Sequence, residues 1–333
     1  MHSFSEYHLF SFTFYGIICS GLTQKTILYF LSSNSSFNEC VRKQNQHTIR
    51  TNQNNALRSV QVNSPCSDTY WEECLSVSRQ RVTSATSFTF KKCIFNSLSD
   101  TSGDGGGGAI YYSSPSIETY TSLLVASCSF SECSALDGGA LYLSTLSTFE
   151  LQNSLFYKCS STLDIYEHGG GSVWITNIQQ QLSLLENDFI SSTCLASGGG
   201  VLIQECSALI SSSSVLLSCR FVDCTATDAS PDGGGVCIWN NSQTIGISTC
   251  LFSLCNSDDD GGAIRHKLDD YEADSFPIRF CFFDKNTANS GNDIQFNILP
   301  SDAPCLYCFS PSESPRVGTY GEIYYNTDYS WLP

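Results

Sequence analysis

The chain has 333 residues, of which only 14% are Lys, Arg, Asp or Glu, well below the roughly 25% that is usual for soluble domains. Its formal charge of −16 repels polyanions, so we expect no nucleic acid partner. With 24 Gly, 18 Cys and a single Met, the composition favours turn-rich β structure over a helical bundle.

Residues 1–31 form an apolar leader. Its core, residues 9–22, has the length of the apolar part of a secretory signal and is too short to span a bilayer. No basic residue precedes it, so a buried first strand or end cap is a second interpretation, and a membrane anchor reaching Leu31 is a third. We expect no membrane-spanning segment elsewhere in the chain.

Charge divides the chain near residue 90. Residues 1–92 carry nine basic and five acidic side chains, whereas residues 93–333 carry seven and twenty-seven. Such an asymmetry marks a boundary between two kinds of segment. We expect residues 32–87, which are polar and basic, to cap one end of the acidic segment that follows.

A two-part repeat fills most of the chain. A Phe recurs every 26 to 35 residues, and a Gly pair followed by apolar residues lies between successive Phe residues. A period near 30 residues is typical of a solenoid. The recurring residues are Phe95, Phe130, Phe156, Phe189, Phe221, Phe252 and Phe283. The Gly pairs are placed at Gly107, Gly138, Gly170, Gly199, Gly234 and Gly261, with a degraded copy at Gly291.

Each repeat has the two-residue period of a β-strand. The side chains five and seven residues before each Phe are apolar in every repeat except at Ser214, and no helical period is sustained. We therefore predict an all-β fold, a parallel β-helix of about seven coils over residues 88–297, with coils about 4.8 Å apart. Residues 298–333 hold five of the nine prolines and are expected to form a C-terminal cap.

The tetrads Gly-Gly-Ala-Ile at 107–110 and 261–264 and the Phe-x-x-Asn form at 283–286 resemble the repeat pair of the polymorphic outer-membrane proteins. That family belongs to the right-handed, pectin-lyase-like β-helices, and similar repeats occur in surface proteins of some protist parasites. The resemblance covers roughly residues 88–297 and implies a secreted or surface-exposed, adhesin-like protein. In this chain the fourth position of the second motif is more often Cys, at Cys133, Cys159, Cys224 and Cys255.

Cysteine also recurs two residues before the repeated Phe, at Cys93, Cys128, Cys219, Cys250 and Cys281. Stacked coils would hold these side chains parallel, near the long limit for a disulfide, so we predict a ladder of free, buried thiols. The better disulfide candidates are Cys66 with Cys74 and Cys305 with Cys308. Zinc at the single Cys-x-x-Cys motif has little support.

Acidic residues precede the Gly pairs, at Asp104, Asp137, Asp232 and Asp260. Asp-Gly is a turn signal, so the simplest interpretation is that these carboxylates close turns. Stacked carboxylates would repel one another, however, and Ca²⁺ between them is the alternative. We expect no other cofactor.

One segment brings acids and bases together in sequence, namely Asp258, Asp259, Asp260, Arg265, His266 and Lys267. The pectin-lyase-like resemblance implies that such groups could cut acidic polysaccharides as a lyase or hydrolase. Charges at this spacing are more often solvated loop residues, and the chain lacks the Gly-His-Gly motif. We therefore predict no catalytic site and keep the enzyme as an alternative.

A binding face is predicted on the strand that follows each Gly pair. The second residue of the strand is always apolar and is placed inward, so the third faces out. This outward column is predicted to be Tyr111, Tyr142, Trp174, Ile203, Ile238, Arg265 and Gln295. The three aromatic residues would offer platforms for sugar rings or for an apolar patch of a partner, unless a loop covers them.

These observations predict a non-enzymatic β-helix, extracellular or on the cell surface, that acts in adhesion or recognition of a glycan or of a host or partner protein. A lyase or hydrolase is one alternative. An intracellular structural repeat protein with reduced thiols is another.

Overall fold

The computed structural model describes residues 70–73, 75–76, 79–83, 87–100, 105–114, 121–165, 168–207, 215–227, 232–241, 245–267, 278–296, 305–306, 308, 316–319 and 322–325. All of them belong to one compact unit, residues 63–333. The leader, residues 1–31, lies outside this set, as do Cys66 and Asp104. Every element within the described residues is a β-strand.

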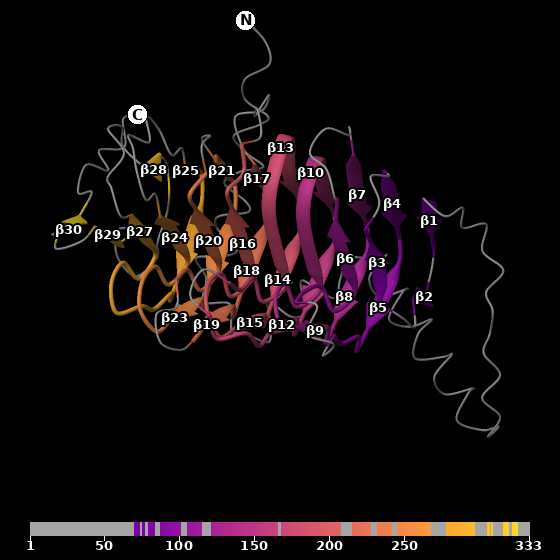
Figure 1. Cartoon of the computed structure of the whole chain (residues 1–333). Coiled ribbons are helices and arrows are strands. Elements are labelled where there is room, and N and C mark those ends of the chain that lie inside the picture. Colours follow the sequence, from indigo (N-terminus) through magenta and orange to yellow (C-terminus); the bar gives the residue numbers. More distant parts are fainter. Residues whose placement is uncertain are drawn as a thin grey trace, which may run out of the picture. The chain divides into compact units, whose positions relative to one another are not determined.

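Three sheets run along the stack of coils (Figure 1). Sheet A has seventeen strands, in two series that merge in the long strands β10 (Leu141–Gln152) and β13 (Val173–Leu185). One series follows the Gly pairs and contains β3 (Gln80–Val82), β6 (Ile110–Ser113), β16 (Val201–Gln204), β20 (Val236–Trp239), β24 (Ile264–Lys267), β27 (Ile294–Phe296), β29 (Arg316–Thr319) and β30 (Glu322–Tyr325). The other contains β1 (Tyr70–Glu72), β4 (Phe88–Lys91), β7 (Ser122–Ala126), β17 (Leu216–Leu217), β21 (Ile247–Ser248), β25 (Ile278–Arg279) and β28 (Cys305–Leu306).

Sheets B and C complete each coil. Sheet B holds eight strands around the recurring Phe: β2 (Leu75–Ser76), β5 (Ile94–Asn96), β8 (Ser129–Ser131), β11 (Leu155–Tyr157), β14 (Asp188–Ile190), β18 (Arg220–Val222), β22 (Leu251–Ser253) and β26 (Phe282–Asp284). Sheet C holds five short strands: β9 (Ser134–Ala135), β12 (Ser160–Ser161), β15 (Thr193–Cys194), β19 (Thr225–Ala226) and β23 (Asn256–Ser257).

Neighbouring strands are successive coils in register. Tyr142 of β10, for example, pairs with Tyr111 of β6 on one side and with Trp174 of β13 on the other. Every strand pair among the described residues is parallel except β29 with β30. The prediction of an all-β parallel solenoid is confirmed, with about six turns where we expected about seven. Its right-handed sense and its two caps stay predictions.

Pairing extends beyond the expected repeat at both ends. Strands β1, β2 and β3 lie in the segment expected to be the N-terminal cap, and they pair in parallel with β4, β5 and β6. In the expected C-terminal cap, β28 and β29 continue sheet A in parallel, and β30 then turns back antiparallel to β29.

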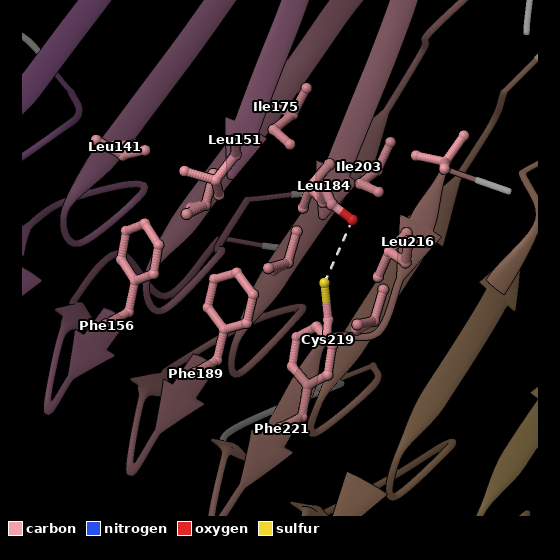
Figure 2. Close-up of a cluster of buried hydrophobic side chains, with 14 of the residues drawn as sticks. Leu141, Leu151, Phe156, Ile175, Leu184, Phe189, Ile203, Leu216, Cys219 and Phe221 are labelled. Atoms are coloured by element: carbon pink, nitrogen blue, oxygen red, sulfur yellow. Dashed lines mark hydrogen bonds between the residues drawn. The ribbon is translucent and has the colours of Figure 1, made fainter. Parts of the chain in front are cut away.

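The core is a stack of side chains from all three sheets. The seven Phe of the repeat point inward from sheet B and are completely buried. Their rings stack along the coils with centroids 4.7 Å apart between Phe130 and Phe156 and 5.4 Å apart between Phe252 and Phe283. Figure 2 shows Phe156, Phe189 and Phe221 as three such rungs, facing Leu and Ile side chains of sheet A. Offset ring stacking adds to the hydrophobic gain from burying each Phe.

Tight corners link the sheets, and each is built on one residue in the left-handed conformation. Between sheets A and B these residues are Glu73, Lys92, Ser127, Asn153, Glu186, Ser218, Thr249 and Phe280. After sheet B they are Ser97, Glu132, Lys158, Ser191, Asp223, Leu254 and Lys285. A side chain in this conformation is costly, so each corner needs compensating contacts.

Cysteine supplies part of that compensation at the turn-cap position, which we define as the residue directly after the left-handed one. Its thiol lies within hydrogen-bond distance of two carbonyls, one two residues earlier and one in the preceding coil, and can donate to either. Cys219 Sγ thus lies 3.6 Å from Leu217 O and 3.4 Å from Leu184 O, the second of which Figure 2 shows. Asn286 caps its corner in the same way, with Nδ2 3.1 Å from Phe252 O. Cys and Asn therefore interchange in the second motif because both cap one turn.

All five cysteines of the predicted ladder occupy turn-cap positions and are buried. They belong to the twelve described cysteines that are free, namely Cys93, Cys128, Cys133, Cys159, Cys194, Cys206, Cys219, Cys224, Cys237, Cys250, Cys255 and Cys281. Cys308, whose Sγ lies 3.9 Å from Ile278 O of the preceding coil, is disulfide-bonded. Its pairing with Cys305 stays a prediction.

Candidate functional site

The outward column of sheet A differs from the predicted one at two places. Strand register places Leu202 beside Trp174, Cys237 beside Leu202, and Arg265 beside Cys237. Ile203 and Ile238 point inward and are completely buried. The left-handed Gly decides which of the following residues point outward. In these two coils it is the first Gly of the triplet, Gly198 or Gly233. We call the observed set, Tyr111, Tyr142, Trp174, Leu202, Cys237, Arg265 and Gln295, the sheet A column.

The aromatic rings of this column stack on one another along the coils. Tyr111 and Tyr142 are parallel with centroids 5.0 Å apart, and Trp174 meets Tyr142 edge-on at 5.0 Å. The guanidinium groups of Arg79 and Arg81 lie 5.3 and 5.2 Å from the Tyr111 ring centre. Trp174 is only 7% exposed. The column therefore leaves mainly the edges of two half-buried tyrosines open to a partner.

Two of the turn acids, Asp232 and Asp260, pair in neighbouring coils, whereas Asp137 pairs with Gly106. The residues directly before the left-handed Gly pair from coil to coil, among them Asp137, Asp232 and Asp260. Asp137 is buried, and its Oδ2 lies 3.0 Å from His168 Nδ1. Burial raises the pKa of Asp137, and the contact with His168 partly offsets this. The His168 ring in turn packs edge-on against Trp174, at 4.9 Å, so this acid helps to hold the aromatic column.

Asp232 and Asp260 share a cation, which is Arg265. Arg265 Nε lies 3.3 Å from Asp232 Oδ1, and Arg265 Nη2 lies 3.1 Å from Asp260 Oδ2. Its side chain is only 2% exposed. Burial raises the pKa of Asp232 to about 7, against the opposing effect of Arg265 and with a further rise from Asp260. The guanidinium of Arg265 thus places a positive charge between these two carboxylates, where the sequence had suggested Ca²⁺ as an alternative.

The rest of the acid and base segment is dispersed. Asp258 and Asp259 are exposed. His266 points into the core against Phe296, and Lys267 Nζ lies over the Trp239 ring, 4.2 Å from its centre. Among the described residues there is no group of three or more His, Cys, Asp or Glu side chains that could hold a metal ion. Within this segment, Asp260 and Arg265 form an ion pair.

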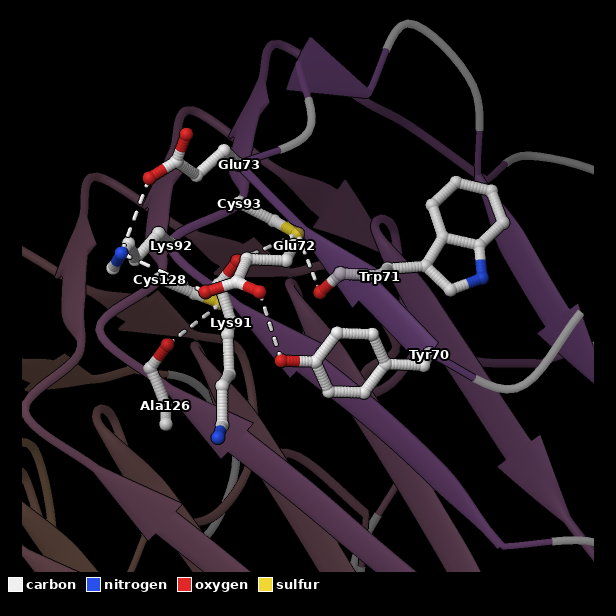
Figure 3. A network of polar contacts seen from close by, with 9 residues as sticks. All are labelled: Tyr70, Trp71, Glu72, Glu73, Lys91, Lys92, Cys93, Ala126 and Cys128. Atoms are coloured by element: carbon white, nitrogen blue, oxygen red, sulfur yellow. Dashed lines mark hydrogen bonds and ion pairs between the residues drawn. The ribbon is translucent and has the colours of Figure 1, made fainter. Parts of the chain in front are cut away.

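Near the first described coil, exposed charges form a small network (Figure 3). Lys92 Nζ lies 3.1 Å from Glu73 and 3.6 Å from Glu72, and the Tyr70 hydroxyl donates to Glu72 over 2.9 Å. The hydrogen bond to Glu73 raises the pKa of Lys92. Exposed ion pairs of this kind contribute little to stability, so we assign this network no functional role.

A more open surface lies on the outside of sheet B. Alternation along each strand points the residues on both sides of the recurring Phe outward. We call the outward residues of β5 to β26 the sheet B face. Half of them are apolar, and none of these is fully buried: Ile94, Leu155, Tyr157, Ile190, Val222, Leu251 and Phe282. The others are Asn96, Ser129, Ser131, Asp188, Arg220, Ser253 and Asp284.

Near the middle of the sheet B face, Asp188 and Arg220 form a two-point ion pair. Arg220 Nε lies 2.5 Å from Asp188 Oδ1, and Nη2 contacts Oδ2. The outside of sheet C is quite different, since it carries only Ser134, Ser160, Thr193, Thr225 and Asn256. The sheet B face was missed in the sequence, although its signal is simple: apolar residues directly flank the recurring Phe.

No helix within the described residues is long and apolar enough to cross a membrane. The chain matches no family model, no curated protein and no solved structure.

Proposed function

We propose that the chain is a non-enzymatic β-solenoid, secreted or on the cell surface, that recognises a protein or glycan partner through the sheet B face. Its repeats, which resemble those of the polymorphic outer-membrane proteins and of the pectin-lyase-like β-helices, favour a right-handed helix and an adhesin-like role. The charge of −16 argues against nucleic acid as that partner.

The contrast between the faces carries this proposal. The outer side chains of sheet C are small and polar, and the C-terminal half of the sheet A column is buried. The sheet B face instead holds Tyr157, Ile190 and Val222 in register on three successive strands, with Tyr157 38% exposed. An accessible row of apolar side chains rimmed by charge is typical of a surface that binds a partner.

The acid and base groups of the described residues support a non-enzymatic role. Asp232 and Asp260 both form ion pairs with Arg265, and Asp137 contacts His168. A glycosidase needs two carboxyl groups at a set separation on either side of its substrate. Here Asp232 and Asp260 both face Arg265, and Asp137 faces His168, which leaves neither set in the arrangement that such an enzyme needs.

An intracellular structural protein is the second candidate, and the twelve free cysteines favour it, because thiols persist in reducing compartments. Burial is a different explanation for the reduced state of these cysteines. Cys206, for example, is almost completely buried, and burial raises its pKa to about 12, so little reactive thiolate forms. Locating the protein by microscopy with and without cell permeabilisation separates the two candidates.

A binding assay with the full chain tests the recognition function. Labelled protein is applied to a glycan array, to matrix proteins and to cells, with and without Ca²⁺. The triple variant Tyr157→Ser, Ile190→Ser, Val222→Ser should lose binding. The matched control changes Ser160, Thr193 and Thr225 to Ala on sheet C of the same three coils and should bind normally.

A third variant, Tyr111→Ser with Tyr142→Ser, asks whether the aromatic edges of the sheet A column contribute. If the full chain binds none of these targets, or if the sheet B variant binds as well as the wild type, the proposal is wrong. Release of cleaved sugar from the array would favour the enzyme instead.

A further inference from the structure

We propose that the sheet B face binds a second copy of this chain, with the two stacks of coils antiparallel. This inference rests on the proposed function only in using the same face. It places a two-fold axis between the two sheets, parallel to the strands and midway between β14 and β18. Strand β14 of one copy then faces β18 of the other, β11 faces β22, and β8 faces β26.

Charge complementarity carries the inference. Asp188 lies on β14 and Arg220 on β18, in the same outward row. The two-fold axis between these strands therefore sets Asp188 of each copy opposite Arg220 of the other. The side chains are 24% and 42% exposed, so both can reach a partner. Four alternating charges at the centre of the contact fix its register and disfavour a parallel arrangement.

The apolar positions match under the same axis. Ile190 on β14 faces Val222 on β18, and Leu155 on β11 faces Leu251 on β22. Each pair occurs twice because a two-fold contact is isologous. Sheets packed face to face lie about 10 Å apart, which is the distance that such side chains fill.

One polar match and two mixed pairs lie farther from the axis, and in one mixed pair Ser129 on β8 faces Phe282 on β26. The Ser131 hydroxyl on β8 faces the Asp284 carboxylate on β26 and can donate to it. Tyr157 faces Ser253, so its ring extends over a small side chain and leaves no clash between two bulky groups.

The size of the face sets the strength of the contact. Six facing strands, β8 to β26, span about 24 Å, and a strip of that length buries less than about 1,000 Å² in the two copies together. This lies at the low end of specific interfaces. We therefore expect a reversible dimer whose population depends on protein concentration.

Sedimentation velocity with the full chain, across a wide range of concentration, tests the inference. The wild type should convert from monomer to dimer as its concentration rises. D188R places two cations at the centre of the face, and R220D places two carboxylates there. Each variant alone should dimerise at least about tenfold more weakly, because like charges then oppose one another.

A mixture of the two single variants gives the decisive test. D188R and R220D are complementary to each other across the proposed axis, so a mixture of the two should form a heterodimer. The double variant D188R/R220D restores every pair, both within one copy and between copies, and should dimerise like the wild type. Thermal melts of each variant show that the fold is kept.

A wild type that stays monomeric at all concentrations overturns the inference, as does a dimer that both single variants retain or a mixture that stays monomeric. Binding to other partners is measured separately. A monomer whose binding still depends on Tyr157 would refute the dimer and leave the recognition function standing. A dimer that binds nothing else would do the opposite.

Discussion

The amide nitrogen Nδ2 of Asn187 lies 3.9 Å from Sγ of Cys219, which occupies the equivalent turn-cap position in the next coil. The two side chains perform the same task. Asn187 Nδ2 donates to Leu151 O over 2.9 Å, and its Oδ1 accepts from the Ser154 N–H over 2.9 Å. The thiol of Cys219 donates to Leu184 O, the corresponding carbonyl one coil later. Amide and thiol are thus two solutions to one buried corner.

Replacing Asn187 tests this equivalence. N187A should lower the free energy of unfolding by about 3 kcal/mol, because it leaves a buried carbonyl and a buried N–H without partners. N187C should cost only about 1 kcal/mol, since a thiol still reaches the carbonyl. Denaturant unfolding followed by circular dichroism measures both values. Equal stability of N187A and N187C would contradict a capping role.

The thiols of Cys194 and Cys206 should be unreactive in the native protein. Burial raises the pKa of Cys194 to about 11 and that of Cys206 to about 12, so at pH 8 almost none of either is thiolate. A chromogenic disulfide reagent should therefore react with these thiols only after denaturation. Cys308 is disulfide-bonded and should need a reductant first. Rapid reaction of several thiols in the folded protein would show that the coils open readily.

Two buried groups should give opposite dependences of stability on pH. Asp232 has a folded pKa of about 7 against an ordinary value of 3.8. Between these values the folded state holds a proton that the unfolded state lacks, so its stabilising effect is complete below pH 3.8 and is lost as pH rises through 7. Burial lowers the pKa of His266 from 6.5 to about 3. Its effect is complete above pH 6.5 and is lost as pH falls towards 3.

Each slope is at most about 1.4 kcal/mol per pH unit, so the two nearly cancel between pH 4 and 6.5 in the wild type. D232N should expose the contribution of His266, and its stability should fall as the solution is made more acidic. H266F should expose the contribution of Asp232, and its stability should fall as pH rises towards 7. Melting temperatures measured across this range check both signs. Parallel curves for the two variants would contradict the assignment.

The β-strands of each coil could be predicted from the sequence, because strand geometry gives apolar residues a period of two and the Phe equivalent to Phe95 recurs once in each coil. The sequence did not show which residues after Gly198 and Gly233 belong to the sheet A column. A Gly triplet has two possible pairs, and only the residue with positive φ decides between them. The side-chain partners of Arg265 and His266 could not be predicted either. Their proximity in sequence suggested one cluster, but adjacent residues on a strand point to opposite faces of the sheet and enter different environments.

The second Gly of each pair should not tolerate a side chain. A Cβ built on Gly139 would lie 2.2 Å from Gly171 O of the next coil and 2.5 Å from Ser160 O, which are both backbone atoms. Gly171 meets Gly199 O at 2.1 Å in the same way. Backbone atoms of stacked coils cannot yield without breaking the strand register, so G139A should cost more than about 3 kcal/mol.

Gly105 provides the control for this prediction. Unlike Gly139, it has a positive φ, of 98°, but nothing lies within 4 Å of the Cβ that would be added. G105A should therefore cost only the backbone strain, about 1 to 2 kcal/mol. In the last copy Asn292 stands where the other coils have the second Gly, and it directly precedes the end of the regular repeat. Denaturant unfolding compares the two variants, and a G139A protein as stable as G105A would mean that the coils can separate without losing their pairing.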